Sequence, residues 1–253
     1  MTTIGQPFHG DRPIEVPAED RLGFGLPAMH IAEAIYQMAS PDGFVIGIEG
    51  EWGSGKSSLI NLVSDALRRV ENAPEVVRFL PWLIRSREGL LKELFTEINK
   101  AAIHIEPDEP QRGWWAELLA EAWPRRYSAR SIRRRRLRDL FSKFSSRLVQ
   151  AGKLAELFGL VGAGVATEAG KRSIDEWLAN ASLDKEKGAI QKELRKLKRK
   201  IVIFIDDLDR LEPDEVAEIL RLVRAVVDFP NVVFVLCYSQ DIIAKNLSTA
   251  LHI

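Results

Sequence analysis

The sequence contains few of the residues that build disulfide frameworks and metal centres. Its 253 residues include one cysteine, Cys237, which excludes an internal disulfide and suits a reducing compartment. The four histidines are scattered along the chain and show no metal-ligand spacing. These absences direct the search for function away from disulfide-rich secreted proteins and from histidine-based metal enzymes.

Charge and hydropathy also lack a strong bias. Lysine plus arginine and aspartate plus glutamate number 36 each, so the zero net charge gives no whole-molecule argument for a nucleic-acid partner. The hydrophobic fraction of 46% and the charged fraction of 28% are ordinary for a soluble globular protein. The first residues lack a basic start followed by an apolar run, so we expect no signal peptide and a cytoplasmic location.

The most informative feature that is present is a complete GxxxxGK[ST] phosphate-binding loop. It reads Gly-Glu-Trp-Gly-Ser-Gly-Lys-Ser over residues 50–57, after an apolar run at 44–48 and before apolar residues at helical spacing over 59–70. Glycines let the backbone approach a phosphate closely, and the loop amides and the helix N-terminus point at the anion. The loop is therefore predicted to bind nucleotide through Gly50, Gly53, Ser54, Gly55, Lys56, Ser57 and Ser58.

A second motif supplies carboxylates. The apolar run at 201–205 is typical of a buried strand in a parallel sheet, and the string Asp206-Asp207-Leu208-Asp209-Arg210 follows it. Carboxylates at that end of a strand lie beside the phosphate loop in open α/β sheets. We expect Lys56 to reach the β- and γ-phosphates, the Ser57 hydroxyl to ligate Mg²⁺, and Asp206 to hold the ion through water. Asp207 is expected to polarise the attacking water.

Other polar residues are predicted at the same edge of the sheet. Arg210 is expected either to pair with Asp209 or to contact phosphate. A further apolar strand is predicted at 232–238, and Ser239 or Gln240 after it is expected to face the γ-phosphate.

The two motifs stand in separate parts of the chain. We predict an N-terminal arm (1–20), two parts of a nucleotide-binding core (21–105 and 196–253) and a mainly helical insertion between them (106–195). Within the core, helices are expected at 27–39 and 88–104 and a strand at 76–79, and within the insertion a charged helix is expected to begin at 185 and reach 200.

The predicted insertion leaves alternatives open. The stretch Arg125–Arg138 contains eight arginines, which could meet nucleic acid or another anionic surface, or could form a solvated helix face. The largely apolar segment 154–167 is shorter than the about 20 residues that a membrane-spanning helix needs, so we expect a packed helix there. Peripheral membrane attachment through the arginines and nearby tryptophans is the alternative.

The motifs together resemble one family. Trp52 within the loop and the string 206–210 are similar to those of the KAP family of P-loop NTPases. Three further strings match along the chain, namely Asp20-Arg21-Leu22-Gly23-Phe24, Val77–Trp82 and Val232–Ile243. The similarity covers about residues 18–104 and 198–248, and this family carries variable insertions, often with transmembrane helices, in the part between.

The resemblance implies an α/β fold, a three-layer P-loop sandwich with a mainly parallel sheet of the additional-strand type. It also implies ATP and Mg²⁺ as ligands, membrane association in many members, and defence against phage or mobile elements in several bacterial ones. The position after the last strand, often acidic in the family, is Ser239 here. The family continues beyond Leu251 with one more strand beside the loop strand. We therefore expect either a fragment truncated before the last core strand, or a partner protein or second copy that covers the open sheet edge.

The leading hypothesis is an ATPase that drives a conformational switch. Water oriented by Asp207 would attack in line, while Lys56 and Mg²⁺ stabilise the transferring phosphoryl group. An arginine finger is expected from a neighbouring subunit, and Arg210 and Arg224 are candidates only by position. The alternative is a nucleotide-binding regulatory module with little turnover that controls a partner or a fused effector. A kinase is the weaker third hypothesis, because no acceptor-binding or lid signature is found.

Overall fold

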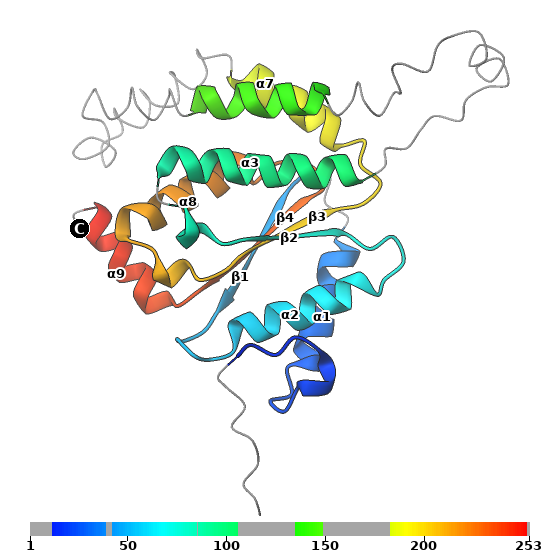
Figure 1. Ribbon diagram of the computed structural model, residues 1–253, viewed down its shortest axis with the longest axis vertical. Helices are drawn as coiled ribbons and strands as arrows, with labels where there is room; N and C mark the ends of the chain where they lie inside the picture. The colour runs from blue at the N-terminus through cyan, green and yellow to red at the C-terminus, as the bar shows by residue number, and fades with distance from the viewer. Residues whose placement is uncertain (1–11, 39–41, 85, 106–134, 149–182, 252–253) are drawn as a thin grey trace, which may run out of the picture.

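A four-stranded parallel sheet forms the centre of the computed structural model, which describes residues 12–38, 42–84, 86–105, 135–148 and 183–251 (Figure 1). The strands β1 (Phe44–Glu49), β2 (Glu75–Phe79), β3 (Ile201–Ile205) and β4 (Val232–Tyr238) lie in the order β1-β4-β3-β2, and every neighbouring pair is parallel. Thus β4 lies between the strand before the glycine loop and the strand before the acidic string. This is the additional-strand arrangement, so the predicted fold class is confirmed.

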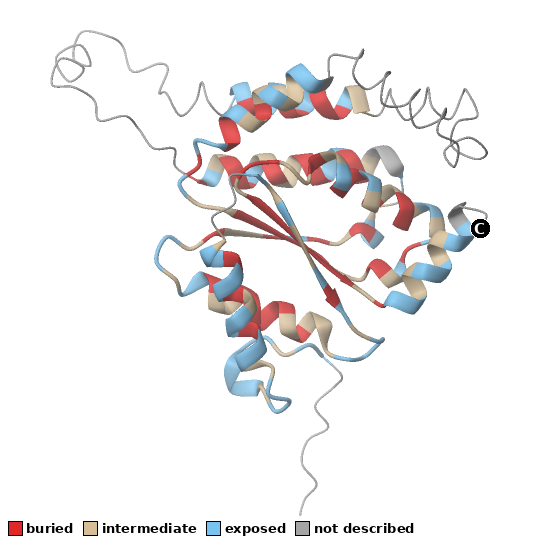
Figure 2. Ribbon diagram, turned by 180° about the vertical axis from the view of Figure 1, so that it is seen from behind, coloured by how far each residue is buried: buried red, intermediate tan, exposed pale blue. Residues whose placement is uncertain are grey.

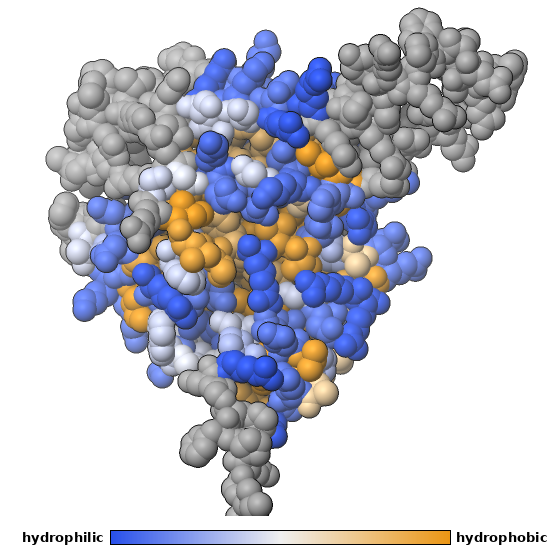
Figure 3. Space-filling model, viewed as in Figure 1, coloured by the Kyte–Doolittle hydropathy of each residue, from blue (hydrophilic) through white to orange (hydrophobic). Residues whose placement is uncertain are grey.

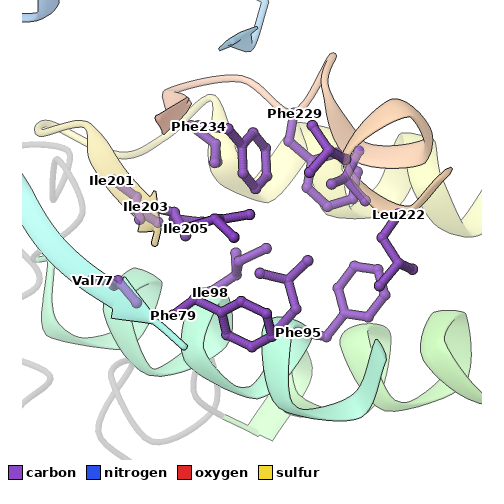
Figure 4. Packing of buried hydrophobic residues seen from close by; sticks show 14 of the residues in the cluster. Val77, Phe79, Phe95, Ile98, Ile201, Ile203, Ile205, Leu222, Phe229 and Phe234 are labelled. Atoms are coloured by element: carbon purple, nitrogen blue, oxygen red, sulfur yellow. The ribbon is translucent and has the colours of Figure 1, made fainter. Parts of the chain in front are cut away.

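Side chains of the central strands alternate between two hydrophobic clusters. From β3, Ile201, Ile203 and Ile205 enter one cluster, whereas Val202 and Phe204 enter the other. Successive side chains of a strand point to opposite faces, so an uninterrupted apolar run is what a sheet covered on both faces requires. Figure 4 shows Ile201, Ile203 and Ile205 in the first cluster, together with Phe79 and Phe95.

Helices cover both faces of the sheet and complete three layers. One face carries α1 (Gly25–Gln37) and α2 (Lys56–Arg68), and the other carries α3 (Arg87–His104) and α8 (Pro213–Val226) (Figures 1 and 2). The last described helix, α9 (Gln240–Leu251), packs beside α8. Each helix of the sandwich presents buried residues inward and exposed residues outward, as Figure 2 shows.

The described part of the predicted insertion extends the same core. Residues 135–148 form a helix, and α7 (Leu183–Leu194) accompanies it on the outer side of α3 (Figure 1). Phe144 packs edge-on against Phe95 of α3, with 5.4 Å between the ring centroids. Phe141 and Phe229, which precedes β4, join the same aromatic group. These helices therefore stabilise the nucleotide-binding core and do not form a separate hydrophobic core.

Most of the arginine-rich stretch and the whole apolar segment 154–167 lie outside the described residues. Of the arginines that are described, Arg136 lies 3.6 Å from the buried carboxylate of Glu193, which also pairs with Lys196 at 2.9 Å. None of the helices in the described part of the chain combines the length and hydropathy that a membrane crossing requires. Figure 3 shows a largely hydrophilic face with apolar residues gathered at its middle.

Two helix predictions were wrong at their ends. The predicted N-terminal arm contains the 3₁₀ turn η1 (Pro17–Glu19). The helix predicted over 185–200 ends at Leu194, where the Asn231 side chain donates to the carbonyls of Leu194 and Leu197. The helix predicted to end at 39 ends at Gln37, because Lys200 donates to two of its last carbonyls.

Within the described sheet, β1 pairs with β4 on one side and has no partner strand on the other. The further strand that the family resemblance predicts after Leu251, or a partner in its place, would pair with this side of β1.

Replacing Phe144 by Ala tests whether the insertion belongs to the core. The ring is buried among Phe95, Phe141 and Phe229, so its loss should lower the free energy of unfolding by about 3–5 kcal/mol. Urea denaturation followed by circular dichroism measures this. Lys143→Ala on the exposed side of the same helix should change it by less than about 0.5 kcal/mol. Equal effects of the two substitutions would contradict the shared core.

Candidate functional site

The glycine loop joins the end of β1 to the start of α2, in a conformation that its glycines make possible. Gly53 has φ of 78° and Gly55 has φ of 88°, values at which a side chain would be strained. At Gly50 a Cβ atom would lie 2.5 Å from Ser54 Oγ, so a side chain there would force the serine to move. The conformation of the loop therefore depends on glycine at these positions, where no side chain covers the backbone.

Lys56 begins α2 and folds its side chain back over the loop. Its Nζ donates hydrogen bonds to the carbonyls of Gly50 at 2.9 Å and Glu51 at 3.0 Å. The first backbone N–H groups of a helix have no partner inside the helix, and its N-terminus attracts anions. The ammonium group thus lies on the loop for which the sequence predicted a phosphate.

Ser57 and Asp206 meet although they stand 149 positions apart in the sequence. Ser57 Oγ donates to Asp206 Oδ2 at 2.8 Å. Asp206 follows β3, and its other oxygen accepts from the N–H of Asp207 at 2.9 Å. A hydroxyl and a carboxylate are the oxygen ligands that Mg²⁺ prefers, and it commonly takes only one or two from protein while substrate phosphates supply others. The described ranges contain no group of three or more acidic, histidine or cysteine side chains that could hold a metal ion.

Asp207 occupies a left-handed turn with φ of 58°, a conformation that aspartate tolerates better than most residues. Burial raises the pKa of its carboxyl, the negative charge of Asp206 raises it further, and Arg210 opposes both. Its Oδ1 lies 3.1 Å from Arg210 Nε. The predicted pair of Asp209 with Arg210 is therefore wrong, because the 3₁₀ turn η3 (Leu208–Arg210) brings Arg210 back to Asp207. Asp209 instead has a buried Oδ1 with no hydrogen-bond partner among the described residues.

Two tryptophans enclose the Arg210 guanidinium, and the sequence analysis missed this contact. The Arg210 Cζ atom lies 5.2 Å from the ring centroid of Trp52 in the loop and 5.5 Å from that of Trp82 after β2. Both indoles are partly exposed. Both tryptophans were visible in the sequence, Trp52 inside the loop and Trp82 after a predicted strand. Their spacing could not show that both rings contact Arg210.

The remaining predicted residues lie at the same edge with different partners. Ser239 is buried directly after β4, whose last carbonyl accepts from Gly50 N at 3.1 Å, so Ser239 stands beside the loop. Gln240 is exposed at the start of α9. Ser58 is buried, and its Oγ accepts from the N–H of Ile14 at 3.0 Å, which leaves its backbone as the group available to a nucleotide.

Phe24 is a second contact that sequence reasoning missed. The Asp20 carboxylate accepts from the N–H groups of Leu22, Phe24 and Gly25, and this turn holds the Phe24 ring against the loop. A Cβ atom at Gly55 would lie 2.5 Å from that ring. The sequence analysis noted that residues 20–24 resemble a string of the family, but the resemblance did not indicate that Phe24 packs on the loop.

Cys237 lies on β4 near these charged groups without being reactive. Burial raises the pKa of its thiol far above the usual range, and the charge of Asp206 adds to the effect. The thiol is therefore a small apolar core group.

Comparisons with known proteins agree with this geometry. The family model "KAP family P-loop domain" matches residues 26–252. The "Phage T7 exclusion protein" of Escherichia coli (strain K12) is 34% identical over 247 residues, which are 96% of this chain and 32% of that protein. The chain thus spans about a third of the length of this curated relative. With a glycine loop, an acidic strand end and the additional strand between them, the chain belongs to the KAP family of P-loop NTPases.

Proposed function

We propose that the chain binds ATP with Mg²⁺ and hydrolyses it, and that the reaction drives a conformational switch. The observation that carries the proposal is the hydrogen bond between Ser57 Oγ and Asp206 Oδ2 at 2.8 Å. With the two side chains this close, a divalent cation ligated by the Ser57 hydroxyl could also be held by the Asp206 carboxylate through water. Guanine recognition by an Asn-Lys-x-Asp string is absent from the sequence, which favours ATP over GTP.

Binding follows from the loop and Lys56. A phosphate in the loop would accept from backbone N–H groups and from Lys56 Nζ, which would exchange its bonds to Gly50 and Glu51 for it. Charge-assisted bonds of this kind are the strong ones, and the ammonium group also offsets charge that develops during transfer.

Hydrolysis depends on a carboxylate that can hold a water molecule. Asp207 is next to the proposed magnesium ligand and half-buried, so its carboxylate is the acceptor placed to orient the attacking water. Bound Mg²⁺ would neutralise charge on the β- and γ-phosphates. Ser239, buried at the end of β4 beside the loop, would supply a polar group at the same edge.

The cellular role that fits best is exclusion of phage. The similar Escherichia coli protein is named for phage T7 exclusion, and the matched region covers nearly the whole of this chain. About two thirds of that relative lie outside the match. We propose that the effector controlled by the switch corresponds to a part outside the aligned region.

One observation favours a regulatory module with little turnover as the second candidate. Asp207 Oδ1 already lies 3.1 Å from Arg210 Nε, so the ion pair takes this oxygen and only the other carboxylate oxygen remains to hold a water molecule. In that case nucleotide binding itself would set the conformation.

Replacing Lys56 by Ala should weaken MgATP binding about 10- to 100-fold, because hydrogen bonds to charged groups contribute about 1.5–3 kcal/mol each. Isothermal titration calorimetry measures the affinity. Lys192→Ala, an exposed lysine on α7, should leave it unchanged. Unaltered affinity in Lys56→Ala would remove the loop from the proposed binding site.

Replacing Asp207 by Asn should lower kcat about 100-fold or more while MgATP affinity stays within twofold of the parent. Asparagine accepts the left-handed backbone at this position, so the fold should be retained. Phosphate release is measured beside Asp184→Asn, an exposed control on α7. If Asp207→Asn and the parent release phosphate equally fast and well above the background rate, Asp207 does not orient the water. If the parent binds MgATP but neither chain releases phosphate above the background rate, the regulatory candidate is correct.

A further inference from the structure

Arg210 is held on three sides by groups from three different elements. Its Nε lies 3.1 Å from Asp207 Oδ1 on the turn after β3. Trp52 from the glycine loop and Trp82 from η2 (Pro81–Leu83) both face its guanidinium. Its own backbone N–H donates to the Asp207 carbonyl at 3.1 Å, which closes the short turn. One carboxylate and two aromatic rings therefore contact the Arg210 side chain.

A second arginine–carboxylate pair in the described part of the chain offers a matched control without aromatic neighbours. Arg221 and Glu218 on α8 have the same spacing of three residues, and their side chains are 45% and 17% exposed against 44% and 20% for Arg210 and Asp207. Their closest approach is nevertheless longer, 3.5 Å, and no aromatic ring of the described residues lies over Arg221. Exposed pairs of this kind generally lose their attraction to screening and to side-chain freedom. Stacking on two indoles removes much of that freedom from Arg210.

We propose that Arg210 is a positioning residue: in contact with Trp52 and Trp82, an arrangement that we call the clamp, it holds the Asp207 carboxylate in the direction that orients the attacking water. The inference rests on the proposed function for its catalytic consequence. It assigns the two tryptophans a role as well, since they keep the guanidinium in place. Because Trp52 belongs to the loop, the clamp also ties the Asp207 carboxylate to the segment that would hold phosphate.

The chemistry of the clamp requires arginine. The planar guanidinium can stack between two rings while Nε, on its edge, meets the carboxylate. A lysine at 210 would keep the charge but would have neither the planar surface nor this edge donor. Charge alone therefore does not reproduce the arrangement.

Steady-state kinetics of ATP hydrolysis test the catalytic part. Arg210→Ala should lower kcat about 10- to 100-fold with little change in KM, because a small misplacement of a catalytic group has effects of about that size. Arg210→Lys should recover only a small part, and Trp52→Phe with Trp82→Phe should lower kcat less than Arg210→Ala. Arg221→Ala, from the matched pair, should behave as the parent. A parent-like kcat in Arg210→Ala, or full activity in Arg210→Lys, would overturn the proposal.

Fluorine NMR tests the clamp itself, without turnover. The chain is labelled with 5-fluorotryptophan, and the Trp52 and Trp82 resonances are assigned by replacing each with Phe. Asp207→Asn should shift both resonances because Arg210 loses its anchor, whereas Glu218→Gln should shift neither. Unmoved resonances in Asp207→Asn would refute the clamp. A parent chain that hydrolyses no ATP but shows the shifts would remove the proposed hydrolysis and leave the clamp as a structural device.

Discussion

One hydrogen bond between residues far apart in the sequence organises this molecule. Ser57 and Asp206 belong to different halves of the core, and their contact at 2.8 Å requires both motifs to be at the same edge of one sheet. The strand order provides this, since β1 and β3 flank β4 and all their carboxyl ends point the same way. The glycine loop reaches the same edge with Gly53 and Gly55 in left-handed backbone conformations. Parallel sheets concentrate ligand groups at this edge, and the arrangement here follows that rule.

The packing on both faces of the sheet keeps the edge rigid. Alternating side chains of β3 join two hydrophobic clusters, so neither face of the strand can move without exposing apolar groups. On the α3 side the aromatic group of Phe95, Phe144 and Phe229 extends this core to the helices of the insertion. The insertion therefore interrupts the sequence between the two motifs without separating them in space. On the other side Phe24 supports the phosphate loop directly.

The sequence predicted the sheet and its covering helices, because long apolar runs and helical spacing indicate them locally. It also predicted that Ser57 and Asp206 lie at one edge, because both follow strands of a parallel sheet. It placed Arg210 beside the wrong aspartate, since a 3₁₀ turn after β3 reverses the side chain within three residues. It also missed Trp52 and Trp82 as a pair, because their meeting depends on the path of β2 relative to the loop. The early end of α7 depends on Asn231, a residue from a distant loop. The sequence pattern therefore failed to predict the contacts that depend on turns and loops between the helices and strands.

The most direct test of the account is whether the Ser57 side chain ligates the cation that accompanies ATP. ATP affinity is measured calorimetrically with Mg²⁺, with Cd²⁺ and without divalent metal, for the parent chain and for Ser57→Cys. Because thiolate ligands favour soft metals, the account predicts that Mg²⁺ strengthens ATP binding by the parent, that Ser57→Cys loses this gain, and that Cd²⁺ restores it. Equal effects of Mg²⁺ on the two chains, or no effect of Mg²⁺ on the parent, would contradict it.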